Sequence, residues 1–220
     1  VAIPLSQTTA STCGAKVMGA RQLEALAEDS GNLFQVPRSL AIPFGVLDCC
    51  LTEDQRDAFH SLRESLPGLK GKAWQIQVEA IHAHLCQTEV PESLVAEVAA
   101  FFGQEARLAV RSSSNGEDLA NLAGAGLYES VVGVLPREIP HAIATVWASL
   151  YTRRATLSRQ QAHIPHEAIQ MAILVQEMIT PDAAFIMHTT DPLRGTPSHA
   201  SVELAVGLGE VLASASEPGT

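Results

Sequence analysis

Apolar residues recur at helical spacing in several parts of the chain. Residues 11–29 begin with small side chains and continue as a periodic segment, whose apolar positions are Ala20, Leu23, Leu26 and Ala27. Repeats three or four positions apart predict an amphipathic helix. Further helices are predicted over 52–66, 73–88, 91–102 and 138–162. Thr52 before two acids is a plausible N-cap, and Gly103 ends the fourth of these five helices.

Short, nearly continuous apolar runs predict strands between and after these helices. The strand segments read "RLAVRSSS" (107–114), "YESVVGV" (128–134), "AIQMAILVQEMI" (168–179), "AAFIMHTTDP" (183–192) and "HASVELAVGLGE" (199–210). Residues 33–46 read as extended segments that Pro37 and Pro43 interrupt. Helices and strands together predict an α+β or α/β fold.

The order of the elements suggests three parts. Residues 1–50 would be the N-terminal part of one lobe, 51–104 a helical insertion or cap, and 105–220 a strand-rich lobe. The chain starts at a valine and stops without a closing element, so we expect a fragment that is incomplete at its C-terminus. At 46% apolar residues, it can bury a sizeable core.

Charge and cysteine usage narrow the class of protein. The formal net charge of −10 argues against nucleic acid as the main partner, because phosphate-backbone binders show a basic face. A few local cations could still hold ATP. The four cysteines contain no CxxC pair and favour reduced thiols in a reducing compartment. No apolar run approaches the roughly 20 residues of a membrane span, and the N-terminus lacks the features of a secretory signal.

The stretch "LAVRSSSNGEDLANLAGAG" (108–126) contains the strongest candidate for chemistry. Arg111 directly follows a strand-like run, so a rigid element would aim its planar, permanently charged guanidinium. The hydroxyls of Ser112, Ser113 and Ser114 and the permissive backbone at Gly124 and Gly126 add what a polyphosphate needs. The alternative is a surface turn in which Arg111 forms a salt bridge, for example with Glu117 or Asp118.

Three weaker candidates lie elsewhere. Lys16 in "CGAKVMG" stands at a helix start, where its charge adds to the helix dipole, although this stretch taken alone favours a solvated lysine. The strand end at Gln176–Glu177 could bind an adenine edge through its backbone, or simply be a strand end. Glu203 in "VELAVGLGE" could reach a metal or a ribose, and alternation places it on the face opposite Val202 and Leu204, toward a cleft or solvent.

The order of these motifs resembles one family. "CGAK", "VPRSLAIPFGV", "VRSSSNGEDLANLAGAG", "LVQEMI", "FIMHTTDPLRG" and "ELAVGLGE" follow one another as in the N-terminal ATP-binding region of the pyruvate phosphate dikinase and phosphoenolpyruvate synthase superfamily. The resemblance covers nearly the whole chain apart from about 51–104, and it implies an ATP-grasp fold. "IPFGV", "AGLYESVVGV", "VWASLYTRRA" and "GLGEVLAS" look like the starch-phosphorylating branch of α-glucan and phosphoglucan, water dikinases, and the combination resembles the phosphoglucan type most closely.

The resemblance implies roles for individual residues. Arg111 and Lys16 match the family's phosphate-binding cations, with Ser112 beside them. Gly126 and Ser130 match the loop that closes on the phosphates. Gln176, Glu177 and Met178 match the segment that lines the adenine. Glu203 remains the least certain member of the set.

The resemblance also implies a reaction. ATP with Mg²⁺ would give its β-phosphate to a histidine on another domain and then to a glucan, and its γ-phosphate to water. That phosphohistidine domain and the metal ligands would lie outside this chain. The protein itself would work in the plastid stroma or the cytoplasm. Phosphoenolpyruvate synthase and antibiotic phosphotransferase are the alternatives within enzymes, and a non-catalytic nucleotide-binding scaffold is the alternative of another class. We expect His163 and His166 to be loop or helix-cap residues.

Overall fold

The computed structural model describes residues 1–116, 126–190, 195, 199–209 and 212. They form a mixture of helices and antiparallel sheet, so the α+β prediction is confirmed. The chain divides into two compact units, Val1–Met178 and Ile179–Thr220. This boundary cuts through the predicted strand-rich part at 105–220. The predicted helical part at 51–104 lies in the first unit, because its helices share one hydrophobic core with the sheet.

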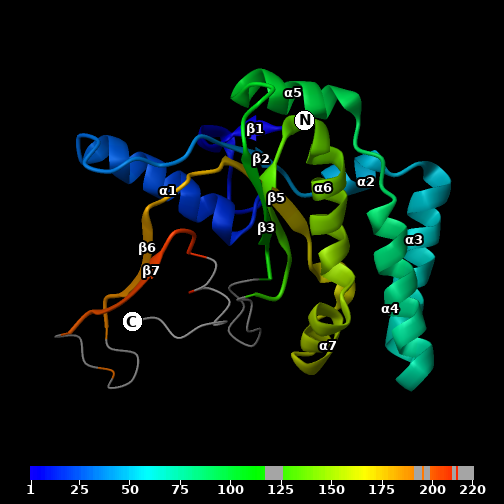
Figure 1. Ribbon diagram of the computed structural model, residues 1–220. Coiled ribbons are helices and arrows are strands. Elements are labelled where there is room, and N and C mark those ends of the chain that lie inside the picture. The colour runs from blue at the N-terminus through cyan, green and yellow to red at the C-terminus, as the bar shows by residue number, and fades with distance from the viewer. Residues whose placement is uncertain (117–125, 191–194, 196–198, 210–211, 213–220) are drawn as a thin grey trace. The chain divides into compact units, whose positions relative to one another are not determined.

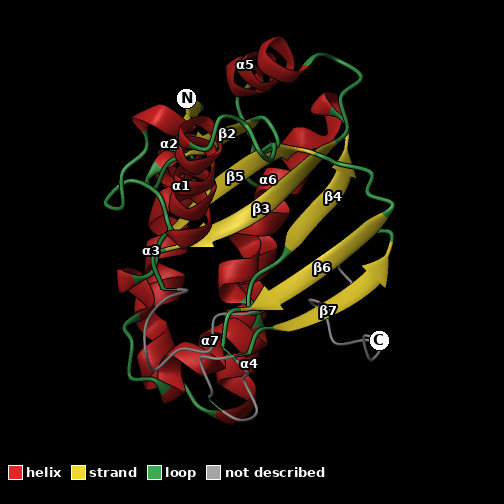
Figure 2. Ribbon diagram, turned by 90° about the vertical axis from the view of Figure 1, so that its left-hand side faces the viewer, coloured by secondary structure: helices red, strands yellow, loops and turns green. Residues whose placement is uncertain are grey.

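The first unit is built around a five-stranded antiparallel sheet (Figures 1 and 2). Its strands, in spatial order, are β1 (Ile3–Pro4), β2 (Ser39–Ile42), β5 (Met171–Glu177), β3 (Leu108–Ser114) and β4 (Ser130–Val134). The central β5 reads as a continuous apolar run because both of its faces are covered by helices.

The helices lie on the two sides of this sheet. In Figure 1, α1 (Ala15–Asp29) lies on one side, and α6 (Ile139–Ala148) lies on the other with α3 (Glu53–Ser65) and α4 (Gly71–Cys86) beyond it. The remaining α-helices are α2 (Val46–Cys50), α5 (Glu92–Phe102) and α7 (Arg153–Gln161). Single 3₁₀ turns are η1 (Leu5–Gln7), η2 (Leu66–Gly68), η3 (Pro136–Glu138), η4 (Ser149–Tyr151) and η5 (His166–Ala168).

Alternate residues of β5 belong to two separate hydrophobic cores. Met171, Ile173 and Val175 belong to the larger core with α6 and α4. Ala172 and Leu174 belong to a smaller core with α1, whose members also include Leu5, Cys13, Val17, Ala20 and Ala41. The smaller core uses small side chains, so α1 packs close to the sheet.

Two helix predictions are corrected by the structure. The helix predicted over 138–162 is two helices, because η4 interrupts it and Thr152 then caps α7 by accepting a hydrogen bond from the Ala155 N–H at 3.2 Å. In α1, Leu23 and Leu26 are 50% and 54% exposed, and the buried positions are Val17, Ala20 and Ala27. Leu23 and Leu26 therefore do not pack in the core, although they follow the apolar spacing of α1.

Two of the predicted helix ends match the structure. Thr52 caps α3 in a reciprocal arrangement with Gln55, and Gly103 ends α5 with a positive φ of 96°. All four cysteines are free thiols. Among the residues that the structure describes, no helix is long and apolar enough to cross a membrane.

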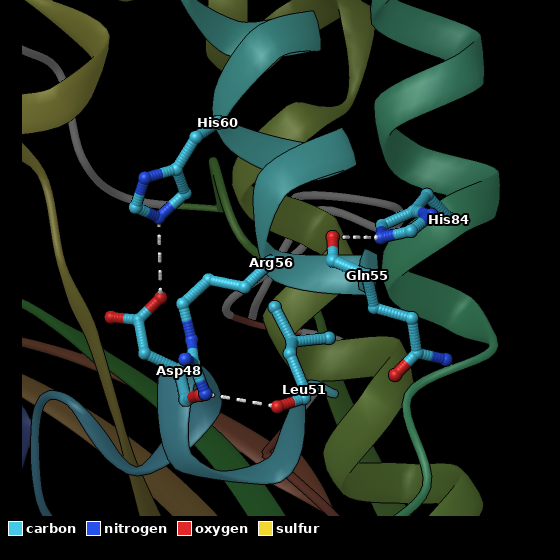
Figure 3. A network of polar contacts seen from close by, with 6 residues as sticks. All are labelled: Asp48, Leu51, Gln55, Arg56, His60 and His84. Atoms are coloured by element: carbon cyan, nitrogen blue, oxygen red, sulfur yellow. Dashed lines mark hydrogen bonds and ion pairs between the residues drawn. The ribbon is translucent and has the colours of Figure 1, made fainter. Parts of the chain in front are cut away.

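Arg56 holds the corner between α2 and α3 (Figure 3). Its guanidinium donates to the Asp48 carbonyl from Nε at 3.0 Å and from a terminal nitrogen at 2.7 Å, and to the Leu51 carbonyl at 3.0 Å. Both carbonyls lie at the C-terminal end of a short helix, where backbone acceptors lack intrahelical partners. His84 Nε2 contacts the Gln55 carbonyl at 2.8 Å and joins α4 to the same corner.

We therefore predict that Arg56→Ala lowers the free energy of unfolding by about 1–2 kcal/mol, because two carbonyls lose a charged donor. Chemical denaturation measures the change. His60→Ala is the control in the same network, since His60 Nε2 lies 3.8 Å from the Asp48 carboxylate in a half-exposed pair. Such pairs contribute little, so we expect a loss below about 0.5 kcal/mol. Equal losses for the two variants would contradict the role of Arg56.

A buried arginine links α7 to the 3₁₀ turns on either side of it, η4 and η5. Arg159 has no exposed surface, and its Nε donates to His166 Nδ1 at 3.2 Å. A terminal nitrogen donates to the Leu150 carbonyl at 2.6 Å, and the guanidinium carbon lies 5.2 Å from the centre of the Tyr151 ring. Burial, and then the neighbouring Arg159 charge, lower the pKa of His166 from 6.5 to about 4. His166 is thus a buried acceptor inside η5, whereas His163 is exposed.

This pKa shift predicts a pH-dependent stability. Between pH 6.5 and 4 the unfolded chain binds a proton at His166 that the folded protein does not, so the free energy of unfolding falls as the pH falls through this range. The contribution reaches about 3 kcal/mol at most, at about 1.4 kcal/mol per pKa unit. Denaturation of wild-type and His166→Asn at several pH values tests it, because the Asn oxygen can still accept from Arg159 but does not titrate. Parallel pH profiles would contradict the prediction.

Candidate functional site

The first unit has a pocket of about 420 Å³ between α1 and the sheet. Its wall comes from α1, from the segment before β2, from β3 and from β5. The lining residues are Lys16, Gly19, Ala20, Leu23, Phe34, Gln35, Val36, Pro37, Arg111, Leu174 and Gln176. Two cations and two amides therefore share a pocket whose other side chains are mostly apolar, as is typical of a small-molecule site.

The N-terminus of α1 lies directly against the end of β3. A Cβ atom on Gly14 would meet backbone atoms of Ser113 and Ser114 at 2.5 Å, so only glycine fits at this position. Gly14 has no side chain to cap the helix. Instead, Ser113 Oγ accepts a hydrogen bond from the Val17 N–H at 3.0 Å and satisfies one free donor of the first turn.

The same junction places Lys16. Its Nζ donates to Ser112 Oγ at 3.2 Å. In the described residues, β4 pairs with β3 only as far as Ser130 opposite Arg111. Ser112, the next residue of β3, therefore lies beyond the segment that pairs with β4. Lys16 and Arg111 are 95 positions apart in the sequence, and the contact between α1 and β3 brings them to one pocket.

Arg111 is held from the neighbouring strand. One of its terminal nitrogens donates to Gln176 Oε1 at 3.2 Å, and Gln176 Nε2 donates to Ser39 Oγ at 3.0 Å. Gln176 lies directly opposite Ser39 on β2 and opposite Ala109 on β3, so Arg111 is its diagonal neighbour on the same face.

Several predicted site residues have other partners in the structure. The Ser112, Ser113 and Ser114 side chains are fully buried, with Ser114 Oγ accepting from the Gly116 N–H at 3.0 Å. In this structure the three hydroxyl oxygens accept hydrogen bonds from Lys16 Nζ, the Val17 N–H and the Gly116 N–H, and their contact with a ligand stays a prediction. Ser112 therefore contacts the pocket through Lys16.

The predicted adenine segment is partly engaged as well. The Glu177 N–H donates to the Arg38 carbonyl at 2.9 Å, and the Met178 N–H donates to the Arg107 carbonyl at 2.8 Å. Neither backbone donor is available to an adenine edge in this arrangement. Of the three predicted residues, the pocket is lined by Gln176.

Gly126 and Ser130 are not among the lining residues of this pocket. Gly126 is exposed with a φ of 65°, and Ser130 is exposed on β4 next to Arg111. The predicted ion-pair partners Glu117 and Asp118, and Gly124, lie outside the described residues.

Glu203 belongs to the second unit, where β6 (Ala183–His188) pairs with β7 (Ser201–Val206). It is exposed and lies opposite Ile186, on the face that the alternation indicated. Val202, Leu204 and Val206 on the other face are exposed too, so burial does not separate the two faces of this hairpin.

The apolar part of the pocket was missed from the sequence. Leu23 and the segment Phe34–Pro37 line it, although the sequence suggested core packing for Leu23 and only an irregular extended segment for 33–46. The available signal was Leu23 itself, an apolar residue beyond the stripe that Val17, Ala20 and Ala27 need for the core.

The lining residues do not fit a divalent metal ion by themselves. Hard cations prefer several oxygen ligands, usually carboxylates. The described lining offers two positive charges and amide oxygens but no carboxylate, and no group of three or more His, Cys, Asp or Glu occurs in the described part of the chain.

The family model of the pyruvate phosphate dikinase AMP/ATP-binding domain matches residues 11–218, so the chain belongs to this family. The predicted superfamily is thereby confirmed. The helical part at 51–104, which the motif resemblance did not cover, lies inside the match.

Three relatives illustrate the range of the family. The chloroplastic alpha-glucan water dikinase of Citrus reticulata is 30% identical over 214 residues, which cover 97% of this chain and 13% of the relative. The rifampicin phosphotransferase of Bacillus cereus is 36% identical over 130 residues, 57% of this chain and 15% of the relative. The phosphoenolpyruvate synthase of Aeropyrum pernix is 30% identical over 162 residues, which cover 70% of this chain and 20% of the relative. The aligned part is thus a fifth or less of each relative.

We predict that Gly14→Ala moves the start of α1 away from β3, because the new methyl group would meet backbone and not a flexible side chain. We expect a loss of about 3 kcal/mol of stability, at the upper end for overpacking, measured by denaturation. Gly19→Ala in the same helix is the control. A Cβ there meets nothing within 4 Å, and alanine favours a helix interior, so this variant should gain up to about 1 kcal/mol. An unchanged stability of Gly14→Ala would refute the close contact.

Proposed function

We propose that the pocket binds ATP, with the base and ribose along its apolar wall and the phosphates at the end that carries Lys16 and Arg111. The observation that carries this proposal is the meeting of two cations from distant parts of the chain in an otherwise mostly apolar pocket. A nucleotide has the matching shape, with an apolar flat base at one end and an anionic chain at the other. The family's AMP/ATP-binding description supports the same ligand.

In this proposal the two cations act differently. Arg111 offers a planar fork that can hold two phosphate oxygens at once, and it is aimed by Gln176 from the neighbouring strand. Lys16 is a point charge on a flexible stem, kept near the phosphates by Ser112. Positioning and charge neutralisation are the main contributions a protein makes to phosphoryl transfer. Ser130, Gly126 and Glu203 remain proposed contacts, Gly126 and Ser130 beside the phosphates and Glu203 with a ribose or a metal.

We propose further that the whole protein is a glucan, water dikinase. It would convert ATP and water to AMP and inorganic phosphate, while the β-phosphate passes to a histidine on another domain and then to a glucan hydroxyl. The length of the match supports this choice, because the alpha-glucan water dikinase of Citrus reticulata aligns over 97% of the chain and the rifampicin phosphotransferase of Bacillus cereus over 57%. The phosphoglucan type, the need for Mg²⁺ and a plastid location are part of the same proposal.

Rifampicin and pyruvate are the competing acceptors, because relatives with those activities are similar to the chain. The full-length protein is incubated with ATP labelled at the β-phosphate and with glucan, pyruvate or rifampicin in separate reactions. Label in glucan supports the dikinase proposal, and label in either other acceptor alone refutes it. A protein that binds ATP and labels none of the three would support the scaffold alternative.

We predict that Arg111→Ala weakens ATP binding by about 10- to 150-fold, because the loss of hydrogen bonds to a charged group costs about 1.5–3 kcal/mol. Arg111→Lys should restore part of the affinity, since it keeps the charge without the planar fork. Calorimetric titration with ATP and the melting temperature are measured together. Arg137→Ala is the control, an exposed arginine in η3 away from the pocket lining. If Arg111→Ala keeps the wild-type affinity for ATP, the phosphate role of Arg111 is wrong. It is also wrong if the affinity and the melting temperature both fall sharply.

A further inference from the structure

Ser39 lies behind the pocket and does not line it, yet it joins two of its walls. Its side chain is 4% exposed. Ser39 Oγ donates to the Pro37 carbonyl at 2.8 Å and accepts from Gln176 Nε2 at 3.0 Å. Pro37 belongs to the pocket wall before β2, and Gln176 holds Arg111.

The chemistry of these groups fixes the direction of every hydrogen bond. A carbonyl can only accept, so the Ser39 hydroxyl proton goes to Pro37 and the Ser39 oxygen must accept from Gln176. The Gln176 amide nitrogen therefore faces Ser39, and its oxygen faces Arg111. A guanidinium can only donate, so the Arg111 end demands the same amide orientation.

We propose that Ser39 is a positioning residue for phosphate recognition: it holds the Gln176 amide in the orientation that aims Arg111 into the pocket. The proposal rests on the proposed ATP function. Ser39 does not line the pocket, and it acts through Gln176 on Arg111. The small Ala109 opposite Gln176 on β3 leaves room for this diagonal contact.

The first test uses full-length protein and three ligands: ATP, tripolyphosphate and adenosine. Loss of one buried neutral hydrogen bond changes an equilibrium about five- to tenfold. Ser39→Ala should therefore weaken binding of ATP and tripolyphosphate by this factor and change adenosine binding less than twofold. Ser39→Thr, which keeps the hydroxyl, should stay within about twofold of wild type for all three ligands. A structural role alone would weaken adenosine and ATP alike, and that result would overturn the proposal.

The second test locates the effect in Gln176. The hydrogen bonds between Ser39 and Gln176 and between Gln176 and Arg111 are called the relay below. In a Gln176→Leu background, Ser39→Ala should cause no further loss of tripolyphosphate affinity, because the relay is already broken. An undiminished additional loss would overturn the proposal. If the wild-type protein binds neither ATP nor tripolyphosphate, the proposed function fails, and the proposed role of Ser39 in phosphate recognition fails with it.

The third test needs no ligand and no altered protein. In the wild-type protein, the side-chain NH₂ of Gln176 should exchange with solvent more than tenfold slower than that of the exposed Gln161, as seen by NMR. Equal exchange rates would show that the relay does not exist, whether or not ATP binds. Slow exchange without phosphate binding would separate an intact relay from a failed function.

Discussion

The site depends on the close contact between the start of α1 and the end of β3. Gly14 allows the two backbones to approach, and Ser113 then supplies the cap that the helix lacks. This contact brings Lys16 from the beginning of the chain to the neighbourhood of Arg111, and the small side chains of the α1 core maintain it. If it were lost, each cation would remain on its own element, but the pocket between them would not form.

The serines after Arg111 show how the same residues can serve a site indirectly. A hydroxyl-rich run after a cation suggests ligand contacts, but the three hydroxyls are buried and bonded to Lys16, to the Val17 N–H and to the Gly116 N–H. Ser112 contacts Lys16 directly, and Ser39 contacts Gln176, which in turn contacts Arg111. Buried hydrogen bonds of this kind reduce the reorganisation that ligand binding would otherwise require.

The large core on the other side of the sheet supplies rigidity to the site. Helices α4 and α6 pack there, and the Arg56 and Arg159 contacts fasten the corners between helices. The helical part at 51–104 is therefore more than a cap in this structure, because it completes the core on which β3 and β5 rest.

Much of the fold and three residues of the pocket, Lys16, Arg111 and Gln176, could be read from the sequence. Periodicity determined α1, α3, α4 and α5 and the strands around Arg111 and Gln176, because local side-chain spacing reflects which face is buried. Lys16, Arg111 and Gln176 were found as candidates since each lies at a helix start or in a strand, in a recognisable local pattern. The superfamily also followed from the order of such motifs.

Tertiary structure alone decided the rest. The 3₁₀ interruption after Ala148, the exposure of Leu23 and the apolar wall at Phe34–Pro37 depend on which elements pack together, and periodicity carries no information about that. The division of the chain after Met178 is likewise a property of contacts between distant segments. The orientation of Gln176 needed three strands in register, because its two partners, Ser39 and Arg111, are 137 and 65 positions away in the sequence.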